Sequence, residues 1–289
     1  MDLPSRIDAV WAFLDAGDAN AALDSARGLH EDHPEDPWVL LARTAAAYFA
    51  ELAGEALDSA REAERLLTVR TPETDHPGGE PADGDTENAL RGARTWRAYA
   101  AFRLWAFDEA EAAARRALGK EGSDPELWDL LARIMERTGR TDEAEEADRK
   151  ASGLDPAAFP LPNRLTDREL DAAVEEAVAR LPGVFQEVLD ATPVVVEPFP
   201  SRELAESPFE DEPPLPPDIL GLFTGTSMMD RSVFNPLERP GTIFLFKGNL
   251  ERECPDRKTL ISEIEITLYH ELAHYLGFDE DDMEDLGLA

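Results

Sequence analysis

The stretch PELWDLLARIMERTGRTDEAEEADRKASGLDP, residues 125–156, decides the fold of the first half of the chain. Apolar residues and alanines recur in it every three or four positions, which is the period of a buried helix face. Gly139 interrupts this pattern, so the stretch predicts two helices joined by a turn. Its alanines allow paired helices to approach closely, while large residues such as Trp128 and Leu131 fill the gaps.

Earlier parts of the chain repeat this pattern. A shift of 34 residues aligns three of the alanines with three earlier ones: Ala132 with Ala98, Ala144 with Ala110, and Ala151 with Ala117. A weaker copy begins at Pro37, and a degenerate one precedes it. Residues 5–158 therefore resemble the tetratricopeptide repeat (TPR) family, which implies an all-α helical-repeat domain that recruits a substrate or a protein partner.

An insertion separates the second and third copies. Residues 71–87, TPETDHPGGEPADGDTE, are rich in proline, glycine and acid and have no apolar period. This composition predicts a disordered loop.

The composition changes near residue 160, which predicts a helical-repeat domain over 1–160 and a second domain over 161–289. All five tryptophans precede residue 130, and prolines gather between 182 and 217. Thr166 and Glu169 have capping-box spacing, so a helix should begin at Asp167. We expect strands at 193–197, 219–223 and 242–246, and a long helix at 256–276. The third strand, TIFLF, is expected to be a core strand; the alternative is an edge strand that binds an extended substrate.

The long helix ends in the strongest chemical signal of the chain, His270-Glu271-Leu272-Ala273-His274. Four residues turn a helix by about 400°, so the two imidazoles point the same way, one turn apart, as a tetrahedral zinc requires. Glu271 projects from the neighbouring face, where it can accept a proton from a water on the metal. The motif H-E-x-x-H thus predicts Zn²⁺ bound by His270 and His274, with Glu271 as general base.

A third ligand must come from beyond the helix, because catalytic zinc usually has three protein ligands and one open position. Gly277 permits the chain to turn back toward the metal. In the extended pattern H-E-x-x-H-x-x-G-x-x-[HD] the third ligand stands ten residues after the first histidine, which is Glu280 here. Six of the seven residues 279–285 are acidic, so Asp279 and Glu284 remain alternatives.

Residues 167–289 resemble the compact bacterial zincin-like metallopeptidase family that carries HExxHxxGxxD. The matching pieces are ARLP, PVVVE, LGLFTG, Asp230-Arg231-Ser232, TIFLFKGNLER and HELAHYLGFDEDDMEDLG. The resemblance implies a small α+β domain with a short sheet packed on the active-site helix. It also implies His270 and His274 as ligands and Glu271 as general base. The chain departs from the family pattern where Glu280 replaces aspartate.

Charge excludes several classes of partner. The chain has 62 acidic and 28 basic residues, a net charge of −34, which repels nucleic acids and anionic membranes.

No run reaches the roughly 18–20 apolar residues of a membrane span, and charges interrupt the first 16 residues, so no secretory signal is expected. Cys254, the single cysteine, cannot form an internal disulfide and is expected to be buried. These features favour a cytoplasmic protein.

Two functions follow from the sequence. The first is a zinc peptidase that hydrolyses a peptide or protein substrate, with the helical repeats recruiting that substrate or a partner. The alternative is a non-catalytic TPR-type scaffold whose metal domain is inactive or structural.

Overall fold

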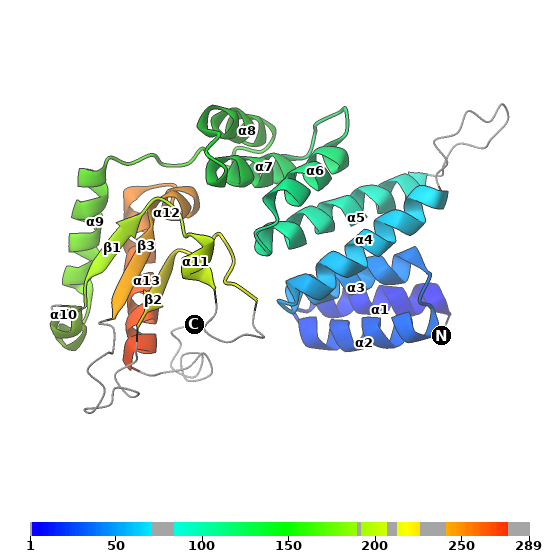
Figure 1. The fold of residues 1–289 in the computed structure, drawn as a ribbon, viewed down its shortest axis with the longest axis horizontal. Coiled ribbons are helices and arrows are strands. Elements are labelled where there is room, and N and C mark those ends of the chain that lie inside the picture. Colours follow the sequence, from blue (N-terminus) through cyan, green and yellow to red (C-terminus); the bar gives the residue numbers. More distant parts are fainter. Residues whose placement is uncertain (1, 71–83, 190–191, 207–212, 226–240, 277–289) are drawn as a thin grey trace. The chain divides into compact units, whose positions relative to one another are not determined.

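The computed structural model describes residues 2–70, 84–189, 192–206, 213–225 and 241–276 (Figure 1). The chain divides into two compact units, Met1–Phe159 and Pro160–Ala289. The first is all helical and the second combines helices with a three-stranded sheet, which confirms the expected multidomain class of all-α repeats followed by a small α+β domain. Among the described residues, no helix has the length and apolar character needed to cross a membrane.

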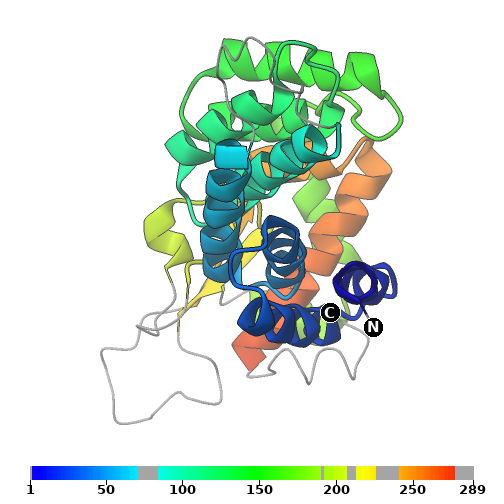
Figure 2. The ribbon, with the colours of Figure 1, turned by 90° about the vertical axis from the view of Figure 1, so that its right-hand side faces the viewer.

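Consecutive helices of the first unit pack in pairs (Figures 1 and 2). They are α1 (Leu3–Asp15) with α2 (Ala19–Asp32), α3 (Pro37–Phe49) with α4 (Ala53–Arg70), α5 (Gly84–Arg103) with α6 (Phe107–Leu118), and α7 (Pro125–Arg137) with α8 (Thr141–Leu154). The first helix of each pair also contacts the first helix of the next pair.

The alanines that defined the repeat are buried between these helices. Those of the last two copies are Ala98, Ala110, Ala117, Ala132, Ala144 and Ala151; those of the second are Ala56, Ala60 and Ala63. The expected end of the insertion was wrong, because α5 already begins at Gly84. Asp85 and Glu87 lie in its first turn, where negative charge favours a helix N-terminus. Residues 71–83 lie outside the described part of the chain.

The turn inside each pair requires a left-handed residue at one fixed position. Gly17, Glu51, Trp105 and Gly139 all have positive φ, between 61° and 78°. They are spaced 34, 54 and 34 residues apart. The middle spacing is 20 residues longer than the other two because the insertion lies within it. In each turn the next N–H donates to the carbonyl five residues earlier, as Asp18 does to Phe13 at 2.9 Å and Leu52 to Ala47 at 2.9 Å. Glu51 and Trp105 thus occupy positions that favour glycine.

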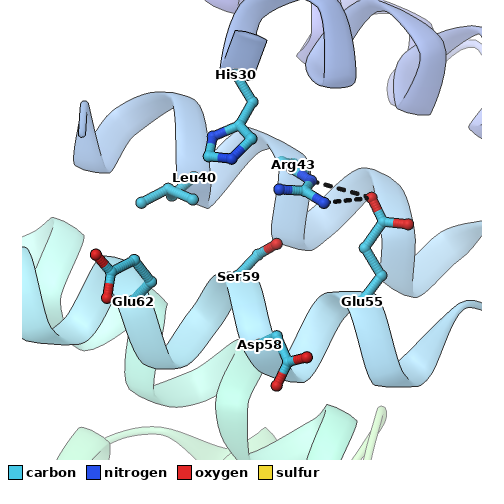
Figure 3. Close-up of a pocket in the computed structure, with 7 residues that line it drawn as sticks. All are labelled: His30, Leu40, Arg43, Glu55, Asp58, Ser59 and Glu62. Atoms are coloured by element: carbon cyan, nitrogen blue, oxygen red, sulfur yellow. Dashed lines mark hydrogen bonds and ion pairs between the residues drawn. The ribbon is translucent and has the colours of Figure 1, made fainter. Parts of the chain in front are cut away.

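Arginine–glutamate triads connect one helix pair to the next. Glu55 on α4 accepts hydrogen bonds from Arg27 on α2 and from Arg43 on α3, at 2.5 and 3.0 Å (Figure 3 shows the Arg43 pair). The same arrangement recurs at Glu109 on α6, which accepts from Arg61 on α4 at 2.6 Å and from Arg97 on α5 at 2.8 Å. Because each carboxylate joins a helix of the preceding pair to its own pair, the triads fix the stacking of the repeats.

The second unit is built on a sheet of order β1-β3-β2. Its strands are β1 (Val194–Glu197), β2 (Gly221–Thr224) and β3 (Thr242–Phe246), with β1 parallel and β2 antiparallel to β3. The helices are α9 (Asp167–Arg180), α10 (Gly183–Leu189), α11 (Arg202–Ala205), α12 (Lys247–Glu253) and α13 (Arg257–Leu276). Helix α13 packs against α9 and against β2 and β3.

The central strand of this sheet is TIFLF. Ile243 and Leu245 are fully buried, and they share one core cluster with five residues of α13, namely Leu260, Ile261, Ile264, Leu268 and Leu272. β3 has a partner on each side, so the edge-strand interpretation of TIFLF was wrong. Among the described strands, β2 is an edge instead. Cys254 is buried as expected, and burial raises the pKa of its thiol to about 12.

Helix α12 was not expected from the sequence, because Gly248 and Asn249 are poor helix formers. A Cβ at Gly248 would overlap the Phe199 ring, so only glycine fits there. The Asn249 amide donates to the carbonyls of Pro217 and Ile219 at 3.2 and 2.6 Å and thereby fixes the chain that enters β2. The capping box at Thr166 and Glu169 is present, and α9 begins at Asp167 as expected.

Replacement of Glu51 by glycine should stabilise the first unit by about 1 kcal/mol, because a Cβ disfavours its left-handed conformation. All five tryptophans lie in this unit, so tryptophan fluorescence during urea unfolding reports on it selectively. Glu51→Ala is the matched control, since it removes the same carboxylate but keeps Cβ. Equal unfolding midpoints for the two variants would contradict the assignment.

Acid should weaken the first unit through Glu109. Hydrogen bonds from Arg61, and next from Arg97, outweigh burial and lower the pKa of Glu109 from 4.5 to about 2. Because the folded-state pKa is depressed, this stabilisation is complete above about pH 4.5 and disappears as the pH falls toward 2. Glu109→Gln should therefore cost about 1–3 kcal/mol at pH 7 and flatten the acid dependence of the tryptophan-monitored unfolding free energy.

Asp58→Asn is the control for this experiment, because Asp58 also pairs with Arg61 but has a side chain that is 81% exposed. Its cost should stay below about 1 kcal/mol. An acid dependence in Glu109→Gln identical to that of the wild type would rule out the triad as its source.

Candidate metal centre

Helix α13 is continuous through the H-E-x-x-H motif, so His270 and His274 lie one helical turn apart along it. The His270 side chain is half-buried. Imidazole nitrogens at this helical spacing form a donor set that suits zinc. The side chain of His274 lies outside the described part of the structure, as do Asp279, Glu280 and Glu284. The described residues accordingly contain no group of three or more His, Cys, Asp or Glu side chains able to hold a metal.

Glu271 is held in a specific place by the sheet. Its side chain is buried, and its Oε2 accepts a hydrogen bond of 2.5 Å from the backbone N–H of Phe223 on β2. A buried carboxylate needs such a donor, because desolvation without a partner is costly. The contact joins the middle of the H-E-x-x-H motif to the sheet edge, and no pattern in the sequence predicts it.

The antiparallel ladder explains why the Phe223 N–H is available for this bond. Phe246 donates to the Leu220 carbonyl at 2.9 Å, and Leu222 stands opposite Phe244. Since paired and unpaired residues alternate in an antiparallel ladder, the N–H of Phe223 points away from β3. The edge strand thus presents a backbone donor to the helix that carries the motif.

Gly221 allows β2 to approach this helix. A Cβ at Gly221 would overlap the Cγ2 of Thr267 and would lie 3.0 Å from the Phe244 carbonyl oxygen. Thr267 lies one turn before Glu271 on α13. Two residues after Gly221, the Phe223 ring packs edge-on against Tyr275, with centroids 5.4 Å apart. Packing of positions 221 and 223 against α13 therefore sets the position of the Phe223 N–H.

Gly221→Ala should push β2 away from α13 and weaken the bond between Phe223 and Glu271. We expect the Phe223 amide to exchange with solvent about 10- to 100-fold faster, as measured by hydrogen-exchange NMR on the full chain. Thr267→Ser, which removes the clashing methyl group, should restore part of the protection in the double variant. Gly183→Ala is the control, because a Cβ there meets nothing within 4 Å; unchanged Phe223 exchange in Gly221→Ala would refute the packing argument.

The comparisons with known proteins give structural neighbours and one family match. Solved structures similar to the chain include MamA, with 18% identity and a TM-score of 0.41 over 54% of this chain and 76% of that one. They also include TTC0263, a thermophilic TPR protein of Thermus thermophilus, with 20% identity and a TM-score of 0.32 over 55% of this chain and 94% of that one. The type IV pilus biogenesis factor PilW has 14% identity and a TM-score of 0.32 over 61% and 84%. The comparison with curated proteins gives no match.

A family match covers most of the second unit. Residues 189–288 contain the whole sheet, α12 and α13 with its H-E-x-x-H motif. This segment matches the zincin-like metallopeptidase family.

Proposed function

We propose that the chain is a zinc-dependent peptidase in which His270, His274 and Glu280 hold the metal and Glu271 is the general base. The observation that carries the proposal is the buried Glu271 carboxylate, oriented by the Phe223 N–H and adjacent to His270 on α13. The zincin-like family match over residues 189–288 supports the same class of activity.

A bound zinc ion would polarise the scissile carbonyl and lower the pKa of the attacking water. The protein's part is proton transfer. The Glu271 carboxylate accepts a proton from that water and returns it to the nitrogen of the departing amine as the peptide bond breaks. The backbone donor at Phe223 keeps the carboxylate in one orientation, which reduces the reorganisation needed for the transfer.

The helical repeats supply a second role in this proposal, recruitment of a protein substrate or partner. The TPR-like repeat pattern and the pairwise helix packing support that role. Recruitment and hydrolysis are separable, since they are assigned to different units of the chain.

Glu271→Gln tests the catalytic assignment. The purified wild type should contain about one zinc per chain and cleave members of a peptide library. Glu271→Gln should retain that zinc but lose at least about 100-fold in cleavage rate, because the amide cannot take up the proton. The double change His270→Ala with His274→Ala should lose the zinc itself. Among the acidic candidates, only Glu280→Gln should lower zinc affinity strongly, whereas Asp279→Asn and Glu284→Gln should not.

Equal cleavage by wild type and Glu271→Gln would contradict the mechanism. If the zinc-loaded wild type cleaves nothing while a partner is still recovered through the repeats, the chain is a scaffold instead.

A further inference from the structure

Four aromatic rings form one cluster on the first helices of two neighbouring pairs. Tyr48 and Phe49 end α3, and Trp96 and Tyr99 lie on α5. The Trp96 ring centroid is 5.3 Å from that of Tyr48 and 5.6 Å from that of Phe49, and Tyr48 lies 6.1 Å from Tyr99. Phe49 is 55% exposed, so the cluster presents an aromatic surface to solvent. We call these four residues the aromatic patch.

The patch already binds one cationic side chain of the protein itself, that of Arg103. The Arg103 guanidinium lies 5.5 Å from the Tyr48 ring centroid and 3.5 Å from the Glu51 carboxylate. A cation between an aromatic face and a carboxylate gains from both the ring quadrupole and the opposite charge. The same chemistry is therefore suited to a cationic side chain from another protein.

Two carboxylates of α7 act electrostatically on Tyr99 of the patch. Burial, followed by the nearby charges of Glu126 and Asp129 on α7, raises the pKa of Tyr99. Asp129 is engaged by Arg133 at 2.7 Å. Glu126 is exposed and makes no hydrogen bond or ion pair within the described part of the chain.

Three arginines of α5 and α7 are already engaged by the protein. Arg103 pairs with Glu51, Arg133 pairs with Asp129, and Arg137 lies 5.2 Å from the Phe102 ring centroid. The accessible groups at the patch therefore include an exposed ring, Phe49, and an exposed carboxylate, Glu126. With a net charge of −34 on the chain, this combination is complementary to a basic segment and repels an acidic one.

We propose that the aromatic patch and Glu126 bind an extended basic segment of a protein substrate or partner, by stacking arginine side chains on Phe49 and Trp96 and pairing with Glu126. This inference deepens the recruitment role of the proposed function, but it does not depend on hydrolysis.

The test uses the full chain carrying Glu271→Gln, so that the probe is not cleaved. The probe is a fluorescein-labelled decapeptide of alternating arginine and glycine, and binding is followed by fluorescence anisotropy. Two comparison peptides replace arginine by citrulline, which keeps its shape without charge, or by glutamate. The arginine peptide should bind at least tenfold more tightly than either.

Phe49→Ala and Glu126→Gln should each weaken binding of the arginine peptide at least threefold. Phe13→Ala and Glu31→Gln are the matched controls on α1 and α2, and they should stay within twofold of the parent. Both positions of the test are exposed, and an unchanged tryptophan-monitored unfolding midpoint will establish that the variants are folded.

Citrulline and arginine peptides that bind equally well would overturn the proposal, and so would equal weakening by test and control variants. Basic-peptide binding without any peptidase activity in the wild type would leave this inference standing and remove the catalytic one. Peptidase activity with no preference for basic peptides would leave the catalytic proposal standing and remove this inference.

Discussion

The hydrogen bond from the Phe223 N–H to Glu271 joins the two parts of the second unit on which its proposed chemistry depends. One part is a helix that carries two histidines at one-turn spacing, and the other is the edge of a three-stranded sheet. A carboxylate between them is buried, so it requires a partner, and the antiparallel ladder leaves the Phe223 N–H pointing outward to supply it. Gly221 permits the close approach that this bond needs. The general base of the proposed reaction is thus oriented by backbone geometry.

The first unit is built by repetition of one helix-pair module. Each helix pair turns through one left-handed residue, and carboxylates such as Glu55 and Glu109 bind arginines from two successive pairs. Because each of these features recurs at equivalent positions, the unit extends by addition of like modules. The insertion between α4 and α5 interrupts the sequence period, yet the turn and triad on its far side occupy the same places in the repeat.

Most of the architecture is readable from the sequence because its signals are local. The alanine period predicts the paired helices, the Thr166–Glu169 box predicts the start of α9, and the apolar run TIFLF predicts the core strand β3. Helix α12 is different, since its Gly248 is selected by contact with Phe199 and not by helix propensity. The repeated left-handed turn could not be predicted at Glu51 and Trp105, because neither residue type indicates positive φ. The motif identifies Glu271, but its partner Phe223 is 48 residues away in sequence and no pattern links them.

The most direct test of the central claim is zinc X-ray absorption spectroscopy on the zinc-loaded full chain. We expect a coordination shell of two imidazole nitrogens and oxygen donors at about 2.0–2.2 Å, with no sulfur. The imidazole signal should be lost when His270 and His274 are both replaced by alanine. A shell containing sulfur at about 2.3 Å, or imidazole scattering that persists in the double variant, would place the metal elsewhere and contradict that claim.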